Sequence, residues 1–312
     1  MNEQSPAVAS GSRLAGALAA GRFAITAEVV PPTSADPQDL LSKALPLKGL
    51  ADAVNITDGA SARAHLSPLA AAALCVQNGV EPILEMTCRD RNRISLQMDL
   101  IGAAALGVHN LLLLRGDDPT QGDQPDAKPV FDLDSAALMA TAVGMRDKGE
   151  LPSGRKVGGK AAFFIGAADN PIDPKPDWKP ERLKQKVDAG ADFAQTQFSM
   201  DAAVVRRYAE RLGEAGILPK LKILIGVAPL RSAQQARWMR ENLFGVIIPE
   251  SFVARMEGAK DQIAEGKAIA VEVISELAEI PGISGVHIMA PQNASAIPDV
   301  ISACSGLRGR KG

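Results

Sequence analysis

Short apolar runs alternate with longer amphipathic stretches along most of the chain. The clearest run is the four leucines at 111–114, which lie between Asn110 and a charged turn. A run this short and this apolar predicts a strand buried on both faces. Similar runs predict strands at 22–30, 53–56, 82–86, 160–165, 193–197, 221–227 and 284–289. Helical spacing predicts helices at 39–50, 67–78, 94–106, 135–148, 181–189, 201–215, 232–242, 251–256, 261–278 and 294–302.

Eight strand-then-helix units in one chain predict an α/β protein, a single-domain (β/α)8 TIM barrel over residues 13–306. A doubly wound sheet is the alternative fold. It would need Gly-x-Gly-x-x-Gly after the first strand, where this chain has Pro31-Pro32. The small and polar residues 1–12 are expected to be a disordered leader. The basic, glycine-rich residues 307–312 are expected to be a frayed tail.

The amino-acid composition limits the kinds of partner that the protein is expected to bind. The formal net charge of −2 gives no reason to expect nucleic acid or an anionic membrane. No apolar run approaches the roughly 20 residues that span a bilayer. Three widely separated cysteines indicate reduced thiols in a cytoplasmic protein. None of the three histidines has the spacing of a metal ligand, so no metal site is expected and each histidine is interpreted as packed or exposed.

Polar residues gather where the predicted strands end, and in a closed barrel these ends meet at one mouth. The set comprises Glu28, Thr57, Asp58, Glu85, Thr87, Arg115, Asp117, Asp169, Asn170, Gln195 and Gln197. An ordinary turn is the alternative at 115–119, because Gly, Asp and Pro are common turn residues. Carboxylates and amides together suit a ligand with a donor-and-acceptor edge, such as a pterin or a flavin.

Glu28 stands near the end of an apolar strand. Burial there should raise the pKa of its carboxyl group and make it a general acid. A structural ion pair with a cation of the rim is the alternative role.

Four stretches in the same order, AEVVPP at 27–32, LRGD at 114–117, LKQKVDAGA at 183–191 and TQF at 196–198, resemble the 5,10-methylenetetrahydrofolate reductase family. The resemblance covers the chain from about Phe23 to Ser302. It implies a flavin-containing (β/α)8 barrel that takes hydride from NADH or NADPH through FAD (or FMN). That hydride reduces 5,10-methylenetetrahydrofolate to 5-methyltetrahydrofolate.

The resemblance also implies roles for individual residues. Glu28 is similar to the acid that opens the folate ring, and Asp117 to the acid that contacts the folate close to the flavin. Gln197 is similar to the amide that holds the pterin, and Gln195 is expected to bind substrate beside it. The residues expected to bind the cofactor are Thr57, Glu85, Arg115, Gly116, Asp169, Asn170 and Lys186.

Three positions depart from the family pattern. Well-known bacterial members have histidine at the position of Glu85, tyrosine at that of Ala168 and phenylalanine at that of Ala233. Loss of two aromatic stacking partners removes about 1 kcal/mol apiece. A flavin-independent variant, with hydride passing directly to the folate, therefore stays open.

Two further interpretations remain. The chain is alternatively a folate-binding, non-redox subunit of a one-carbon methyl-transfer system, as the missing aromatic pair allows. Another pterin-using barrel, such as a methyltransferase, would keep the amides of the rim but gives Glu28 no obvious task. A reduced folate is the expected partner of both the reductase and the folate-binding subunit. Apolar barrel helices allow a homo-oligomer.

Overall fold

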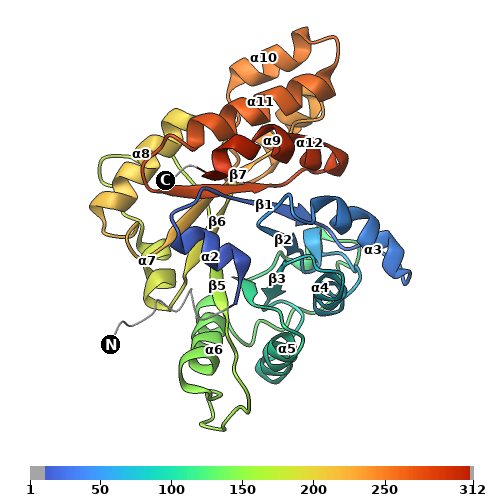
Figure 1. Ribbon diagram of the computed structural model, residues 1–312, viewed down its shortest axis with the longest axis vertical. Coiled ribbons are helices and arrows are strands. Elements are labelled where there is room, and N and C mark those ends of the chain that lie inside the picture. Colours follow the sequence, from blue (N-terminus) through green and yellow to red (C-terminus); the bar gives the residue numbers. More distant parts are fainter. Residues whose placement is uncertain (1–10, 310–312) are drawn as a thin grey trace.

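The computed structural model describes residues 11–309 and shows a closed barrel of eight parallel strands (Figure 1). Each strand pairs with the next one in the sequence, and β8 pairs with β1 to close the ring. This arrangement confirms the (β/α)8 barrel. The strands are β1 (Ala24–Val29), β2 (Ala53–Ile56), β3 (Pro82–Thr87), β4 (Asn110–Leu114), β5 (Phe164–Asp169), β6 (Phe193–Phe198), β7 (Lys222–Val227) and β8 (Ile283–Ile288).

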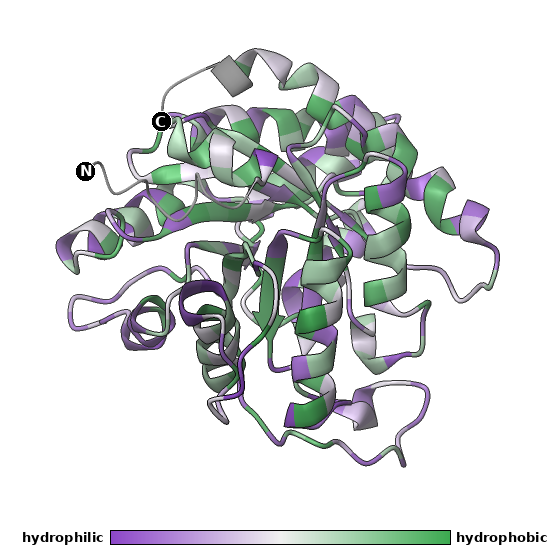
Figure 2. Cartoon of the chain, turned by 60° about the horizontal axis from the view of Figure 1, so that its bottom comes forward, coloured by the Kyte–Doolittle hydropathy of each residue, from purple (hydrophilic) through white to green (hydrophobic). Residues whose placement is uncertain are grey.

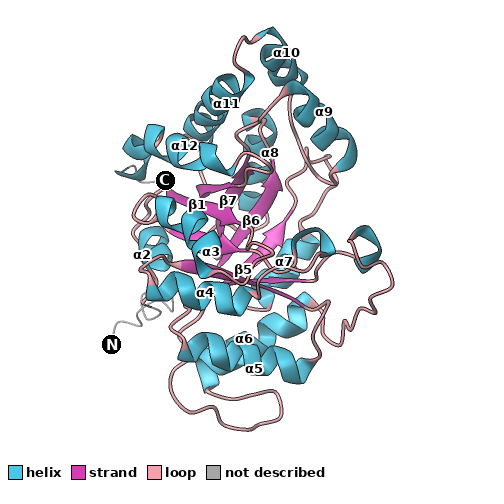
Figure 3. Ribbon diagram, turned by 90° about the vertical axis from the view of Figure 1, so that its right-hand side faces the viewer, coloured by secondary structure: helices cyan, strands magenta, loops and turns pink. Residues whose placement is uncertain are grey.

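Helices surround the barrel, as Figure 3 shows with cyan helices outside magenta strands. They are α2 (Arg13–Ala19), α3 (Pro37–Ala44), α4 (Pro68–Gln77), α5 (Arg93–Ala105), α6 (Ser135–Lys148), α7 (Glu181–Asp188), α8 (Ala202–Glu214), α9 (Ala233–Asn242), α10 (Glu250–Gly258), α11 (Gln262–Leu277) and α12 (Ile297–Ala303). Short 3-10 helices include η1 (Leu45–Leu47), η4 (Ala294–Ala296) and η5 (Ser305–Gly309). In the described part of the chain, no helix combines the length and apolar character needed to cross a membrane.

Most strand residues are apolar, and Figure 2 shows largely green strands in the centre of the molecule. Their outward side chains pack against the helices, as expected for a parallel barrel. At the amino-terminal end of the barrel, the inward side chains form an apolar plug. Its members are Ala24, Ala53, Ile83, Leu112, Phe164, Phe193 and Leu224.

Helix α2, for which the sequence analysis assigned no element, covers the plug. Its residues Leu14, Ala15 and Leu18 belong to the same buried cluster. Ser12 caps the helix, and Glu81, in front of β3, accepts hydrogen bonds from Ser12 Oγ at 3.0 Å and Leu14 N at 3.0 Å. These contacts close the barrel at the end opposite to the polar rim.

Two expectations about segment limits need correction. The fifth strand runs from Phe164 to Asp169 and does not begin at residue 160. The strand includes Gly166, where a Cβ would come within 2.4 Å of the Phe193 ring, so that only glycine fits there. The frayed tail expected from residue 307 is also wrong at its start, since Leu307 is buried and η5 continues to Gly309. Residues 310–312, like residues 1–10 of the expected leader, lie outside the described part.

Shortening Leu14 tests whether α2 supports the barrel. Leu14→Ala should lower the free energy of unfolding by about 2–5 kcal/mol, because the side chain is fully buried and leaves a cavity. Leu45→Ala is the control, at a leucine that is 41% exposed, and should change stability by less than about 1 kcal/mol. Urea denaturation gives both values. Equal midpoints for the two variants would show that α2 does not stabilise the barrel.

Candidate active site

A layer of buried polar side chains lies directly above the apolar plug. Gln195 of β6 donates from Nε2 to Thr26 Oγ1 at 3.0 Å and to Asn55 Oδ1 at 2.9 Å. Asn55 of β2 donates from Nδ2 to Gln195 Oε1 at 2.7 Å and to Glu85 Oε1 at 3.0 Å. On the other side, Thr26 Oγ1 lies 3.0 Å from His287 Nδ1 of β8. Five strands are thus joined across the barrel by one continuous hydrogen-bond network.

His287 is neutral in this network. Burial lowers the pKa of its imidazole to about 3, so the ring is not protonated near neutral pH. The described residues include no group of three or more His, Cys, Asp and Glu side chains placed to hold a metal ion. His287 is buried, and its partner is the hydroxyl group of Thr26, which confirms the interpretation of this residue as a packed histidine.

Glu28 stands above this layer, two residues after Thr26 on the same strand, and is half-buried. Burial, together with the charge of nearby Glu85, raises the pKa of its carboxyl group to about 8. No ion pair of Glu28 occurs in the described part of the chain, which argues against the alternative structural role. The carboxyl group is therefore protonated near neutral pH and can act as a general acid.

Glu85 on β3 is the second buried carboxyl group. Burial raises its pKa to about 7, while the hydrogen bond from Asn55 acts in the opposite direction. The charges of Asp58 and Asp117 also raise it. Glu28 and Glu85 form a like-charge pair in which protonation of one carboxyl group favours ionisation of the other.

Thr57 and Gln197 present polar groups at the same end of the barrel. Thr57 follows β2 and is buried, and within the described residues its Oγ1 has no hydrogen-bond partner. Gln197 is half-buried near the end of β6, where its Oε1 accepts from Phe198 N at 3.0 Å; no described residue accepts a hydrogen bond from its NH2 group. A buried hydroxyl group without a partner is costly unless a bound molecule satisfies it.

The turn after β4 carries three of the predicted residues. Gly116 has φ +93°, and a Cβ there would lie 3.0 Å from Thr87 Cβ, so the turn needs glycine. The Arg115 guanidinium lies 4.2 Å from the centre of the Phe131 ring. Asp117 is exposed, yet close enough to Glu85 for its charge to raise the pKa of that carboxyl group.

Asp169, Asn170 and Lys186 form a separate group at β5 and α7. Tyr208 donates its hydroxyl hydrogen bond to Asp169, and burial raises the pKa of that carboxyl group. The Lys186 ammonium donates to the Ala168 carbonyl oxygen, and burial lowers its pKa while Asp169 opposes the shift. Asn170 is exposed and lies against Gly245.

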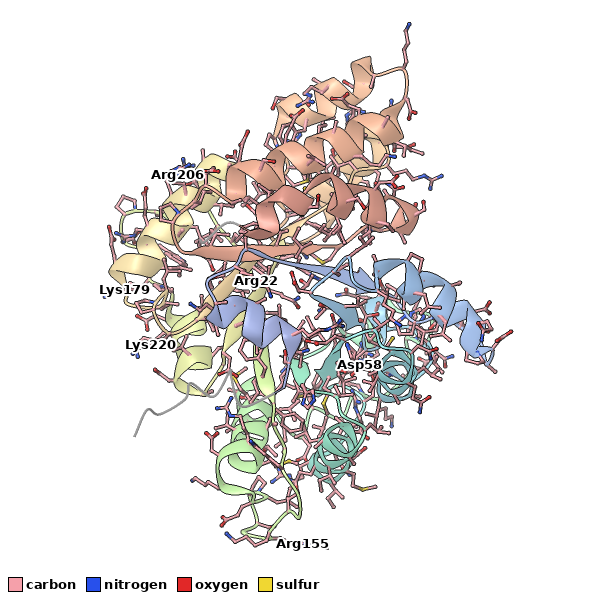
Figure 4. The ribbon with its side chains drawn as sticks, viewed as in Figure 1. Arg22, Asp58, Arg155, Lys179, Arg206 and Lys220 are labelled. Atoms are coloured by element: carbon pink, nitrogen blue, oxygen red, sulfur yellow. The ribbon has the colours of Figure 1, made fainter. Side chains whose placement is uncertain are left out.

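The structure thus brings Glu28, Glu85, Gln195 and Thr57 to the interior end of the mouth. Gln195, predicted to bind substrate, has both ends of its amide bonded within the barrel. Sequence reasoning missed Asn55, whose only signal was one amide in a four-residue buried strand. Asp58, shown in Figure 4, accepts from Thr87 N at 2.7 Å and pairs with Arg91, so it braces the rim.

The residues present fit a flavin poorly. Ala168 offers no ring to stack on an isoalloxazine. The cationic group of Lys186 is already bonded to a backbone carbonyl.

Comparisons with known proteins agree on one family. A family model described as Methylenetetrahydrofolate reductase matches residues 13–305. Methylenetetrahydrofolate reductase 1 of Schizosaccharomyces pombe is 25% identical over 285 residues, which cover 87% of this chain and 44% of that protein. The 5,10-methylenetetrahydrofolate reductase of Pectobacterium carotovorum subsp. carotovorum is 24% identical over 274 residues, 85% of this chain and 84% of that protein. The chain thus spans less than half of the yeast relative but most of the bacterial one.

A solved structure shares the fold. It is described as an uncharacterized protein from Clostridium thermocellum that binds two copies of 5-methyl-5,6,7,8-tetrahydrofolic acid. The TM-score is 0.63 at 13% identity, with 95% of this chain and 99% of that chain covered. The match of the family model over almost the whole barrel establishes that this chain belongs to the methylenetetrahydrofolate reductase family.

Proposed function

We propose that the protein reduces 5,10-methylenetetrahydrofolate to 5-methyltetrahydrofolate with hydride from NADH or NADPH. The observation that carries the proposal is Glu28, a carboxyl group with a pKa of about 8 at the mouth of a barrel of this family. The bacterial relative of similar length is named for this reaction. Glu85, the other carboxyl group with a raised pKa in this part of the barrel, is buried, whereas Glu28 is partly exposed at the mouth.

The proposed role of Glu28 is to protonate N10 of the folate. The C–N10 bond of the five-membered ring then breaks, its electron pair stays on N10 as a lone pair, and the lone pair of N5 forms the iminium bond to the methylene carbon. Hydride from NAD(P)H adds to that carbon and gives the N5-methyl group. One hydride and one proton are consumed, and Glu28 regains its proton from solvent.

Gln197 and Asp117 are proposed to hold the pterin. The free NH2 group of Gln197 donates to the pterin, and a carboxylate can accept two N–H bonds from an aminopyrimidine edge. The negative charge of Asp117 would also stabilise the positive iminium group. Gln195 is proposed to act through Asn55, since these two amides fix the carboxyl group of Glu85 below Glu28.

The poor fit of a flavin leads us to route no step through one. In this proposal the nicotinamide gives its hydride to the methylene carbon directly. Ala168 supports this choice, because it provides a small side chain where stacking of a flavin would need a ring.

A second candidate is a folate-binding protein that transfers no hydride. The absence of a ring at Ala233 favours it, since a nicotinamide would also stack there. The neighbour with the shared fold is described as binding 5-methyltetrahydrofolate, which is consistent with folate binding in either case.

Replacing Glu28 tests the proton donor. Glu28→Gln should reduce the rate of methyl formation by at least about 100-fold, because general acid catalysis contributes that much. The variant should still bind 5-methyltetrahydrofolate, measured by calorimetry. Glu276→Gln, an exposed residue of α11, is the control and should keep the wild-type rate. A fully active Glu28→Gln enzyme would remove the proposed donor.

Glu85→Gln should change the pH profile. The reaction needs protonated Glu28, so the rate should fall as pH rises through about 8. Glutamine keeps a hydrogen-bond acceptor for Asn55 but removes the charge that raises the pKa of Glu28. The alkaline limb of kcat against pH should therefore move to lower pH. An unchanged limb would show that the two carboxyl groups do not interact during turnover.

Isotope transfer separates direct from flavin-mediated reduction. With NADH deuterated at the transferred C4 position, the methyl product should retain the deuterium, and added FAD or FMN should leave the rate unchanged. A flavin intermediate would exchange the label with solvent before the methyl group forms. Loss of label, or stimulation by added flavin, would contradict the direct route. Mass spectrometry of the folate product gives the answer.

A further inference from the structure

The helices on one side of the barrel carry few charges. α4, α5 and α6 pack beside one another and lie together along the lower side of the molecule in Figures 1 and 3. α4 contains no charged residue, α5 contains Arg93 and Asp99, and α6 has its three charged residues in its last three positions. By contrast, α8 carries five charged residues in 13 positions. We call the outer surface of α4, α5 and α6 the α4–α6 face.

α5 differs from the other helices because its exposed side is apolar. Ile94 is 66% exposed, Met98 64% and Ile101 38%. They stand four and three positions apart, so they form one stripe along the outer side of the helix. On the inner side, Leu96 and Leu100 are buried against the barrel. Apolar residues on both sides are typical of a helix that is buried on both sides.

Two further exposed apolar side chains extend the stripe at its ends. Leu106 is the C-cap residue of α5. Val130 lies near the beginning of α5, since Asp132, two residues later, forms an ion pair with Arg93. Five of the nine large exposed apolar side chains in the described part of the chain are thus on α5 or at its ends. Apolar side chains that gather on one surface in this way mark an interaction site.

The α4–α6 face is large enough for a dimer interface. α5 has 13 residues and is therefore about 20 Å long. With α4 and α6 on its two sides, at the usual 8–10 Å between helix axes, the face is roughly 30 Å wide. Its plane measures about 600 Å² per copy, or about 1,200 Å² for two copies, which is the lower end of the range for specific interfaces. The scarcity of charged residues also matches the core of an interface.

The stripe is complementary to itself when two copies of α5 run antiparallel. Met98 stands near the middle of α5, so a twofold axis there places Met98 next to its counterpart and Ile94 against Ile101 of the other copy. Arg93 then comes close to the end of the other α5, whose last turn has no basic residue. A cation stabilises that end of a helix. No like charges meet at the axis, because the exposed residues of α5 after Arg93 are all apolar.

We propose that the α4–α6 face is the interface of a homodimer in which two copies of α5 pack antiparallel around Met98. A second copy of this chain is the partner because the apolar stripe and the charge at its end both match their own twofold images. No residue of the candidate active site belongs to α4, α5 or α6, so the inference does not depend on the proposed function.

Analytical ultracentrifugation of the full-length protein tests the proposal. The wild type should sediment with the mass of two chains at micromolar concentration. Met98→Glu brings two carboxylates together at the axis and should raise the Kd of the dimer at least about tenfold, because like charges that face each other across an interface are unfavourable. Met98 is exposed in the single chain, so this variant should keep the circular dichroism spectrum of the wild type. Ile263→Glu, at an isoleucine of α11 that is 45% exposed, is the matched control and should remain a dimer.

Cross-linking tests the antiparallel geometry. Met98→Cys should give a covalent dimer with a short bismaleimide, since a residue on the axis meets its own counterpart. The native cysteines are buried, and Ile263→Cys should not cross-link. The proposal is overturned if the wild type has the mass of one chain, if Met98→Glu dimerises like the wild type, or if Met98→Cys does not cross-link. The first of these results would assign the face to residues 1–10 or to another protein instead.

Discussion

The structure depends on burying two carboxyl groups above an apolar plug. Burying an isolated charge in such a place costs free energy. The carboxyl groups are stabilised there by protonation and by the linked amides of Asn55 and Gln195, of which Asn55 donates to Glu85. The network reaches from His287 on β8 to Glu85 on β3 and occupies the barrel interior at one level. Because it satisfies Glu85 but leaves Glu28 unpaired, the two carboxyl groups differ in function although both have raised pKa values.

The sequence predicted the order of the elements well, because eight apolar runs separated by amphipathic stretches leave few topologies. It failed where tertiary space decided the outcome. Position 166 of β5 needs glycine because a Cβ there would lie 2.4 Å from the Phe193 ring, and no local pattern shows that ring. Helix α2 begins where Glu81, distant in the sequence, accepts hydrogen bonds from Ser12 Oγ and from the backbone N–H groups of Arg13 and Leu14.

The candidate site, too, was predicted only in part from the sequence. Glu28 was recognisable because a carboxylate in an apolar strand is rare. The electrostatic interaction of Glu28 with Glu85 could not be recognised in the sequence, since the two residues become neighbours only when the barrel closes. The interior use of Gln195 was equally hidden: two glutamines, Gln195 and Gln197, alternate along β6, and only the fold shows that the first bonds to Asn55 and the second to its own strand.

The central claim is that Glu28 holds a proton at neutral pH. The most direct measurement is a carbon-13 NMR titration of protein labelled at glutamate carboxyl carbons, with Glu28→Gln used to assign the signal. The account predicts that the Glu28 signal titrates near pH 8. A Glu28 signal that titrates in the ordinary range of an exposed carboxyl group, near pH 4.3 or about one unit around it, would contradict it.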